Sequence, residues 1–506
     1  TDQTWDGQIG VEITGDVASS KLNSGANTIW LEIHLQPGVG VDALYVDWFE
    51  IEYRRAFVAQ EDRLAFTRPT GYSEYQVTGF GGSDVGVYDV TAPRDAVRLT
   101  DTQTTGGTLR FRDETAGAEQ YVAVRLRTPA LMEPDSVVRV DSGTNLRAPG
   151  IGANYLIITY ADFTTAANQL AAFRSADFTA LVVQVQDIYN QFGNGVLDPE
   201  AIHDFLAYAV DNWSPSPQYV LLMGDGSYDY RDYLGESRAN YIPPYMDMVD
   251  PWMGETANEN YYAAVSGGDI VPDLFVGRAP VNTLAEAKAF VDKVIGHEGG
   301  LGLGANQVGL PQTAPDPSAL FVADKADPRA GDFPRLADEI AADCLPDIYS
   351  VQKVYYGETH DTVSAVRSAI ISNINQGQRF VNYIGHAGVT QWGATYGFFG
   401  TSDISGLSNA GKFPVVLGLT CLEGSFQDAL QDAMAEEMVR TANKGAIASW
   451  SPAGMGVATG HDKLSRGFYD ALFQEDVRRL GPATVAGKVQ VYNAGSNLDL
   501  VHTFAL

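Results

Sequence analysis

The chain has 506 residues, of which 45% are hydrophobic and 11% aromatic, a composition that excludes a disordered or fibrous protein. Its 63 acidic residues outnumber its 33 basic residues, and the net charge of −30 repels phosphate backbones, so we expect no nucleic-acid partner. With only Cys344 and Cys421, the sequence also excludes a disulfide-stapled scaffold and a cysteine-based zinc cluster.

The sequence contains no candidate membrane span, because no run approaches the roughly 20 consecutive apolar residues that a spanning helix needs. It begins with Thr-Asp-Gln, and no positively charged segment followed by an apolar stretch opens the chain. We therefore expect a mature product whose targeting segment has been removed, and a secreted or cell-surface location.

Residues 1–148 are expected to form an all-β sandwich domain. Alternating apolar and polar residues occur in short runs, among them TIWLEIHL from Thr28, ALYVDWFEIEYRRAFV from Ala43, TLRFR from Thr108 and YVAVRLR from Tyr121. A period of two is typical of half-buried strands, and clusters of Gly, Pro, Asp and Thr separate the runs. Since no long helical pattern interrupts them, an antiparallel sandwich is predicted.

Residues 149–506 change to an α/β pattern. Apolar strand-like runs begin at Tyr155, Ala180, Tyr219, Asp273, Ala319, Arg379, Phe413 and Gly445, and helical segments include 161–174, 198–213, 284–298 and 432–443. Continuous apolar strands that alternate with amphipathic helices indicate a parallel sheet covered on both faces. We predict one domain in two halves, 149–298 and 305–506, joined by a Gly-rich stretch, with residues 229–272 as an irregular insertion.

Two chemically reactive residues follow two consecutive buried strands. His386 comes directly after RFVNYIG, and Cys421 comes directly after FPVVLGLT. Ligands of open parallel sheets bind beyond the carboxyl ends of the strands, so an imidazole and a thiol are expected to face one cleft. Such a pair can supply a nucleophile and a proton carrier. A buried Cys and a strand-end His also occur as packing residues, which is how we interpret Cys344.

Other motifs in the sequence do not indicate a second catalytic site. There is no G-x-S-x-G elbow, which excludes the α/β-hydrolase arrangement, and the glycines at 224 and 226 lack the remainder of a phosphate-binding motif. Asp324 and Asp327 lie in an acidic loop that offers oxygen ligands for a structural Ca²⁺, although solvated turns have the same composition. We expect no required cofactor.

Four segments resemble the gingipain-type cysteine peptidases: YVLLMGDGSYDYR from Tyr219, PDLFVGRAPV from Pro272, NYIGHAG from Asn382 and PVVLGLTCLEGSF from Pro414. The resemblance runs in the family's order from YLIITYADF at Tyr155 to GAIASWSPAGMG at Gly445. It implies a caspase-like catalytic domain preceded by a β-rich segment, so residues 1–148 would be a propeptide-like or accessory domain. It also implies a Cys nucleophile with a His partner, and these correspond to Cys421 and His386.

The resemblance further implies an oxyanion hole built from the backbone N–H groups of Cys421 and of the residue after the histidine. That residue is Ala387, where relatives commonly have glycine. Alanine keeps the N–H donor and loses the freedom to adopt a positive φ. The predicted hole therefore has altered geometry or supports a slow reaction.

The same resemblance suggests where substrate is recognised. In relatives that cleave after basic residues, an acid in the insertion lies at the base of the primary pocket, and Glu259 occupies the similar position, which predicts a preference for a basic residue. Trp450 and Ser451 would form another pocket wall. Asp247, or alternatively Asp250, would orient His386 as a third carboxylate.

These observations predict a secreted or cell-surface cysteine endopeptidase that acts on proteins or peptides through an acyl-enzyme on Cys421. Two alternatives remain. A sortase-like transpeptidase of a secretion system would pass the acyl group to an amine instead of water. A non-catalytic caspase-like module would use the same fold for binding or assembly, and the alanine at position 387 keeps this alternative open.

Overall fold

The computed structural model describes residues 11–23, 25–32, 34, 46, 48–53, 55–68, 70–115, 117–126, 143–235, 238–299 and 317–506. The chain divides into two compact units, Asp16–Arg139 and Val140–Leu506, the second of which also includes Thr1–Gly15. The domain boundary after residue 148 stays a prediction. No helix in the described part of the chain is long and apolar enough to cross a membrane.

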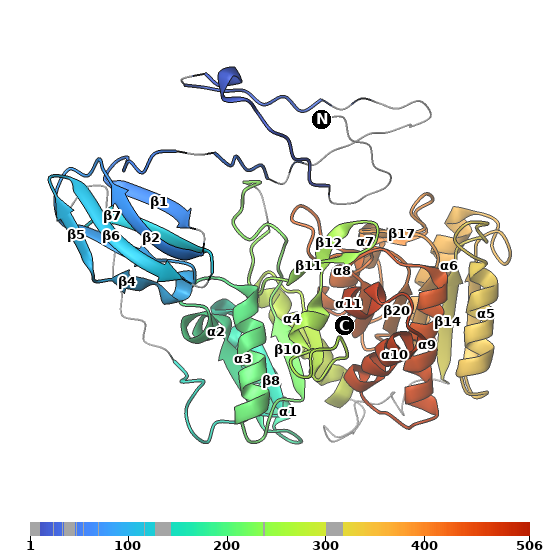
Figure 1. Cartoon of the computed structure of the whole chain (residues 1–506). Helices are drawn as coiled ribbons and strands as arrows, with labels where there is room; N and C mark the ends of the chain where they lie inside the picture. Colours follow the sequence, from blue (N-terminus) through green and yellow to red (C-terminus); the bar gives the residue numbers. More distant parts are fainter. Residues whose placement is uncertain are drawn as a thin grey trace. The chain divides into compact units, whose positions relative to one another are not determined.

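The smaller unit is an antiparallel sandwich, drawn in blue to cyan in Figure 1. One sheet has the order β1 (Arg63–Arg68), β7 (Glu119–Arg125), β3 (Val85–Asp89) and β4 (Val97–Leu99), and the other has the order β2 (Gly71–Val77), β6 (Thr108–Thr115) and β5 (Thr102–Thr105). Apolar side chains from both sheets, such as Val77 and Tyr121, form one buried cluster between them. The predicted sandwich is thus present.

Two predicted strands of this region are not observed. The described residues of the runs that begin at Thr28 and Ala43 belong to no strand, and apolar side chains such as Trp30 and Phe49 are exposed. Alternation of apolar and polar residues indicates which side chains could share one face of a strand. A strand forms only when its backbone has a hydrogen-bonding partner. The prediction of strands in these runs was therefore wrong for the described residues.

The first half of the larger unit is a parallel sheet of four strands. Its order is β13 (Phe275–Ala279), β10 (Tyr219–Met223), β8 (Tyr155–Thr159) and β9 (Ala180–Gln184). Helices α1 (Thr164–Arg174) and α4 (Leu284–Gly299) pack on one face, and α2 (Val185–Phe192) and α3 (Pro199–Asn212) pack on the other. Buried Val, Ile and Leu side chains on both faces explain why these strands lack alternation.

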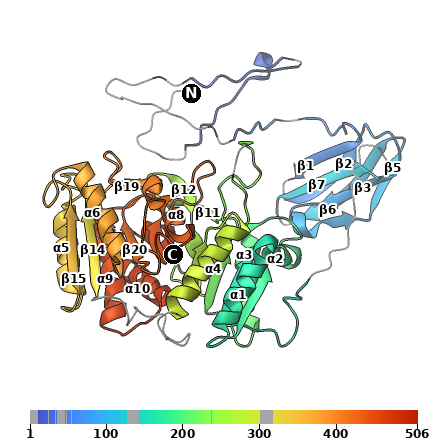
Figure 2. The same cartoon turned by 180° about the vertical axis from the view of Figure 1, so that it is seen from behind.

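The second half contains a sheet of six strands. Its order is β15 (Ser350–Tyr355), β14 (Ser318–Ala323), β16 (Phe380–Ile384), β20 (Val415–Leu419), β21 (Ala448–Pro452) and β22 (Phe504–Ala505). All neighbouring pairs are parallel except β21 with β22. One face carries α5 (Phe333–Cys344), α9 (Ala458–Phe473), α10 (Leu480–Ala494) and α11 (Asp499–Thr503), and the other carries α6 (Val363–Gln376), α7 (Thr401–Ile404) and α8 (Met434–Arg440), as Figures 1 and 2 show.

The chain end joins the two halves. The terminal strand β22 pairs with β21, and the carbonyl oxygen of Leu506 accepts a hydrogen bond from the N–H of Arg278 in β13 at 2.8 Å. The last residues therefore lie between the two sheets. The parallel sheets with helices on both faces, together with the N-terminal sandwich, confirm the predicted fold class.

The predicted insertion contains regular structure. Residues Met246–Asp250 (β11) and Gly254–Ala257 (β12) form an antiparallel hairpin, which the 3₁₀ turn Glu259–Tyr262 follows. A small sheet of β17 (Ala387–Gly388), β18 (Gln391–Trp392) and β19 (Phe399–Gly400) follows β16. Figures 1 and 2 show the hairpin and the small sheet at the same edge of the unit.

Candidate active site

His386 and Cys421 lie at the carboxyl ends of two adjacent parallel strands. Strands β16 and β20 pair in a register that places Ile384 beside Leu419, and each reactive residue lies two positions beyond this pair. The hydroxyl of Thr420 donates to the carbonyl oxygen of Gly385 at 2.6 Å, which ties the two strand ends together. The structure thus brings the predicted imidazole and thiol to one sheet edge.

The loop after β20 is fixed by backbone hydrogen bonds to the loop after β21. The N–H of Leu422 donates to the carbonyl oxygen of Gly454, and the N–H of Gly424 donates to that of Pro452, each at 2.9 Å. Leu422 has a φ of 59°, in the left-handed region that non-glycine residues rarely occupy. This sharp turn presents the partly exposed Cys421 at the edge of the sheet.

The surroundings of Cys421 favour the protonated form of its thiol. Its burial raises its pKa above the usual thiol value, and the negative charge of Asp250 acts in the same direction, while the hydrogen bond to Gly456 lowers it. The Sγ atom donates to the carbonyl oxygen of Gly456 at 3.6 Å. A base must therefore remove the thiol proton before the sulfur can attack a substrate.

The imidazole of His386 contacts Asp327. Nε2 of His386 lies 3.3 Å from Oδ2 of Asp327, and the ring packs edge-on against Phe333 with 5.3 Å between the ring centroids. Backbone N–H groups of Arg329 and Ala330 donate to the Asp327 carboxylate and lower its pKa, so it stays ionised beside the ring. Among the described residues, no hydrogen bond joins the ring to the Cys421 thiol.

The residue that contacts His386 differs from the predicted third carboxylate. Asp247 accepts a hydrogen bond from the side chain of Asn258 at 3.2 Å, and Asp250 binds backbone N–H groups. Asp327 follows β14, the strand beside β16, so the strand-end rule that located His386 and Cys421 applies to it as well. The acidic loop in the sequence suggests Asp327 only as a calcium ligand.

Glu259 does not form the base of an open pocket, which corrects the prediction. Its carboxylate binds the guanidinium of Arg278 in a bidentate pair, with Nε–Oε2 at 3.0 Å and Nη2–Oε1 at 2.8 Å. The side chains are only 7% and 4% exposed. Arg278 also donates to the carbonyl oxygens of Gly224 and Ile242. The charged groups of Glu259 and Arg278 are therefore paired within the fold.

Trp450 and Ser451 are buried residues of β21, and their part in a substrate pocket stays a prediction. The Trp450 ring is buried against Phe468 and Phe504, with centroid distances of 5.5 Å and 5.4 Å. Ser451 is also buried, and its hydroxyl lies 2.8 Å from that of Ser449. Alternate residues of β21 point into the two covered faces of its sheet.

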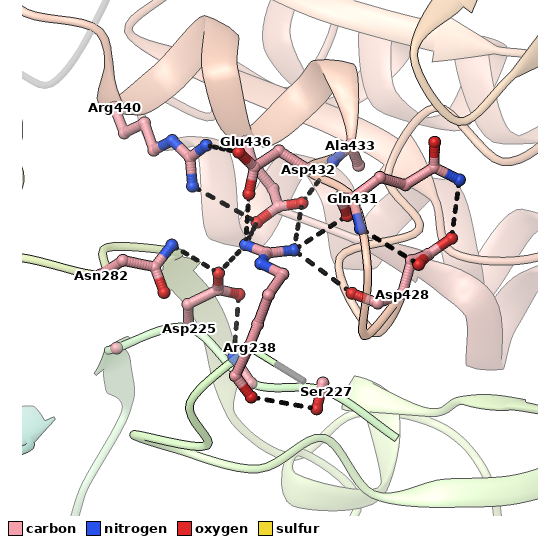
Figure 3. A network of polar contacts seen from close by, with 12 residues as sticks. Asp225, Ser227, Arg238, Asn282, Asp428, Gln431, Asp432, Ala433, Glu436 and Arg440 are labelled. Carbon is pink, nitrogen blue, oxygen red and sulfur yellow. Dashed lines mark hydrogen bonds and ion pairs between the residues drawn. The ribbon is translucent and has the colours of Figure 1, made fainter. Parts of the chain in front are cut away.

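The acidic residues that gather in space differ from those chosen as calcium ligands. In the described part of the chain, Asp324 and Asp327 belong to no group of three potential ligands, whereas Asp225, Asp432 and Glu436 do. Figure 3 shows Arg238 between these three carboxylates, with its guanidinium 2.7 Å from Asp432 and 2.8 Å from Glu436 and also paired with Asp225. Arg440 pairs with Asp432 as well. Two guanidinium groups thus occupy this acidic cluster.

The backbone around the histidine can provide an oxyanion donor. The N–H of Gly393 donates to the carbonyl oxygen of His386 at 2.8 Å, and Ala387 is paired with Trp392 in the next position of the ladder. Hydrogen-bonded and non-hydrogen-bonded pairs alternate in an antiparallel ladder, so the N–H of Ala387 points away from β18. Ala387 is not among the residues with positive φ, and its alanine side chain therefore introduces no backbone strain.

Sequence reasoning missed a buried carboxylate two residues after Cys421. Glu423 is fully buried and accepts a hydrogen bond from the indole N–H of Trp392 at 2.8 Å. Burial raises the pKa of this carboxyl group to about 7. A Cβ at Gly418 would collide with the Glu423 side chain, which explains the glycine inside an otherwise apolar strand. The sequence signal for Glu423 was an acidic residue close to the predicted nucleophile Cys421.

Comparisons with known proteins identify the family of this chain. The model of peptidase family C25 matches residues 148–506. Gingipain R2 and gingipain R1 of Porphyromonas gingivalis are each 25% identical to this chain over 248 residues, which is 48% of this chain but only 29% and 22% of those proteins. The chain therefore spans less than a third of the length of these relatives.

Solved structures show the same fold. The Arg-specific cysteine proteinase gingipain R superimposes with a TM-score of 0.56 at 18% identity, covering 70% of this chain and 76% of that one. The complex of the pro- and mature domains of Porphyromonas gingivalis RgpB gives a TM-score of 0.56 at 18% identity, over 69% and 77% of the two chains. The larger unit thus has the caspase-like fold, and because the family model spans most of its length, the chain belongs to peptidase family C25, the cysteine peptidases of gingipain type.

Proposed function

We propose that this protein is a cysteine endopeptidase that hydrolyses peptide bonds in proteins or peptides, with Cys421 as nucleophile and His386 as its proton-transfer partner. One observation carries the proposal. A partly exposed thiol and an imidazole follow two adjacent parallel strands at the same register position, in a chain of a cysteine peptidase family. The carboxyl edge of a parallel sheet is where such folds bind their ligands.

The reaction begins with proton transfer. Because the surroundings of Cys421 favour the protonated thiol, His386 takes the proton as the sulfur attacks the carbonyl carbon of the scissile peptide bond. A rotation of the exposed imidazole toward the thiol precedes this step, since Nε2 faces Asp327 in the structure. The protonated His386 then passes its proton to the amine as the scissile C–N bond breaks. The acyl group remains on Cys421 as a thioester.

Water completes the cycle. His386 takes a proton from the water that attacks the thioester carbonyl, and the acid product leaves as the thiol regains a proton. The backbone N–H groups of Ala387 and Cys421 are our candidates for stabilising the oxyanion of each tetrahedral intermediate. Asp327, in place of the predicted Asp247, is our candidate for holding the ring and stabilising its charged form.

The test is turnover of a fluorogenic protein substrate by the full chain and by Cys421→Ala and His386→Ala variants. Loss of turnover in Cys421→Ala, and a fall of about 10²- to 10⁴-fold in His386→Ala, are expected. Cys344→Ala is the matched control, because Cys344 is the buried cysteine and burial raises its pKa to about 11. Full activity in Cys421→Ala would refute the proposal.

The acceptor of the acyl group needs its own measurement. Mass spectrometry of the products in the presence of an added amino-terminal glycine peptide separates hydrolysis, which we propose, from transpeptidation. We also propose a secreted or cell-surface location, in line with the resemblance to gingipains, and fractionation of the producing cells tests it.

A further inference from the structure

The hairpin of β11 and β12 carries exposed apolar side chains at its tip. Met248 is 68% exposed, Trp252 is 38% exposed and Met253 is 43% exposed. Large apolar side chains that gather on a surface mark a place where another molecule binds. The hairpin belongs to the predicted insertion, whereas both reactive residues belong to the second half of the unit.

Asp250 attaches this tip to the Cys421 site. Its Oδ1 accepts hydrogen bonds from the backbone N–H groups of Trp252 at 2.8 Å and Met253 at 2.9 Å. Its Oδ2 accepts from the N–H of Met455 at 2.5 Å. Met455 directly precedes Gly456, whose carbonyl oxygen accepts from the Cys421 thiol. One buried carboxylate thus holds the hairpin tip and the loop beside the nucleophile in a fixed relation.

Apolar packing supports the same placement. Ala257 of β12 belongs to a buried cluster with Phe426 from the loop after Cys421 and Ala453 from the loop after β21, and Met246 of β11 packs against it. The base of the hairpin is therefore part of the walls of the site. Its tip extends from these walls with Trp252 and Met253 exposed.

Three acids near the Cys421 loop are engaged within the fold. Among the described residues, Asp250 is the charged group whose field acts on the Cys421 thiol, and it is buried with three backbone N–H donors on its oxygens. Glu259 is paired with Arg278 inside the fold. Glu423 is buried, and its carboxylate accepts a hydrogen bond from the indole N–H of Trp392. These three carboxylates are therefore not free to pair with an arginine, and the exposed acid of the hairpin is Glu255, which lies opposite Met248 on β12.

The composition of the surface suits varied apolar groups. Four of the chain's eight methionines, Met246, Met248, Met253 and Met455, lie in the hairpin or against it. Methionine side chains are flexible and polarisable, and they adapt to partners of different shape. Together with the Trp252 indole they provide an adaptable apolar surface, which Asp250 ties to the loop that contacts the thiol.

We infer that the hairpin tip and Met455 form a substrate subsite that selects bulky apolar side chains, such as those of Met, Leu and Phe, instead of Arg or Lys. This inference rests on the proposed function, because it takes the peptide around the bond attacked by Cys421 as the occupant. It replaces the basic preference that the position of Glu259 suggested.

A binding measurement tests the subsite without requiring catalysis. The full-length Cys421→Ala variant is titrated with fluorescent peptides that differ at one position, Phe or Met against Arg, and the position is first chosen by scanning a peptide library. We expect the apolar peptides to bind at least about tenfold more tightly, the usual effect of losing one apolar pocket contact. Equal or tighter binding of the arginine peptide would overturn the inference.

A matched pair of surface variants locates the contact. Trp252→Ser in the Cys421→Ala background is expected to remove the discrimination, because it keeps the backbone N–H bound to Asp250 and deletes the indole. Ile348→Ser is the control, since Ile348 is an equally apolar exposed residue just before β15, at the opposite end of the strands. Unchanged discrimination in Trp252→Ser, with an unchanged melting temperature, would overturn the assignment.

The two failures are distinguishable. If the Cys421→Ala variant binds apolar peptides selectively but the wild-type chain cleaves none of them, the proposed function fails and the binding surface stands. If the wild-type chain cleaves through Cys421 but after Arg or Lys, the proposed function stands and the apolar subsite is wrong.

Discussion

Trp392 donates its indole N–H to the buried carboxylate of Glu423 at 2.8 Å, and this bond joins the hairpin after His386 to the loop after Cys421. Both side chains are fully buried. The N–H of Glu423 also donates to the carbonyl oxygen of Cys421 at 2.7 Å, so any movement of Glu423 is passed to the nucleophile. The relative position of the two reactive residues thus depends on a carboxyl group that touches neither of them.

Replacing Glu423 with glutamine should change how stability depends on pH. Burial raises the pKa of Glu423 from 4.5 to about 7, so the folded protein binds more protons than the unfolded chain between these values and its stability falls as pH rises. This fall, about 3 kcal/mol, should be absent in Glu423→Gln. Denaturant unfolding of both proteins at pH 4.5 and pH 7 measures it, and parallel pH profiles would contradict the ionisation assigned to Glu423.

The Cys421 thiol should become more acidic in Asp250→Asn. The variant removes the negative charge that, after burial, raises the pKa of the thiol, so the thiolate forms at lower pH. The rate of alkylation by iodoacetamide, followed against pH at Cys421, should show its inflection at a lower pH than in the wild type. Asp247→Asn on the same strand is the control and should leave the inflection in place. Identical curves for Asp250→Asn and wild type would mean that this charge does not act on the thiol.

Glu259→Gln should destabilise the fold and leave substrate preference unchanged. The substitution leaves the buried guanidinium of Arg278 without its counter-charge, which costs about 3–5 kcal/mol. Denaturant unfolding measures the loss, and Asp347→Asn, at an exposed position, is the control with an expected change near zero. A stable variant with an altered preference would restore Glu259 as a pocket acid.

Arg238→Met should be strongly destabilising at neutral pH and less so in acid. The guanidinium of Arg238 lies among the carboxylates of Asp225, Asp432 and Glu436 (Figure 3), and its removal leaves buried negative charges facing one another at a cost of about 3–5 kcal/mol at pH 7. Burial already raises the pKa of Glu436, so protonation toward pH 5 should relieve part of this loss. Arg335→Met, which breaks only exposed pairs, should cost about 1 kcal/mol or less. Equal losses in the two variants would show that the acidic cluster does not need its arginine.

Local patterns in the sequence were sufficient to place the reactive pair. Each residue follows an apolar run long enough to be a buried strand, and parallel strands end at one edge, so His386 and Cys421 could be located without knowledge of distant contacts. The edge strand β15 was missed because its residues Ser350, Gln352 and Lys353 face solvent and interrupt the apolar pattern.

The partners of the acids could not be predicted in this way. Glu259 meets Arg278 and Asp225 meets Arg238 only because loops and strands of different segments converge, and burial then decides whether a carboxylate faces a substrate or an internal cation. The described residues of the runs at Thr28 and Ala43 show the same limit for strands, since alternation cannot specify a pairing partner.

Leu422, the residue after Cys421, has a left-handed backbone conformation that affects both the stability of the turn and the position of the thiol. A non-glycine residue in this conformation costs about 1–2 kcal/mol, which glycine would recover. Glycine would also widen the range of turns open to the Cys421 loop and so reduce the fraction of molecules with the thiol in position. A Leu422→Gly change would therefore relieve strain in the turn and at the same time loosen the backbone that positions Cys421.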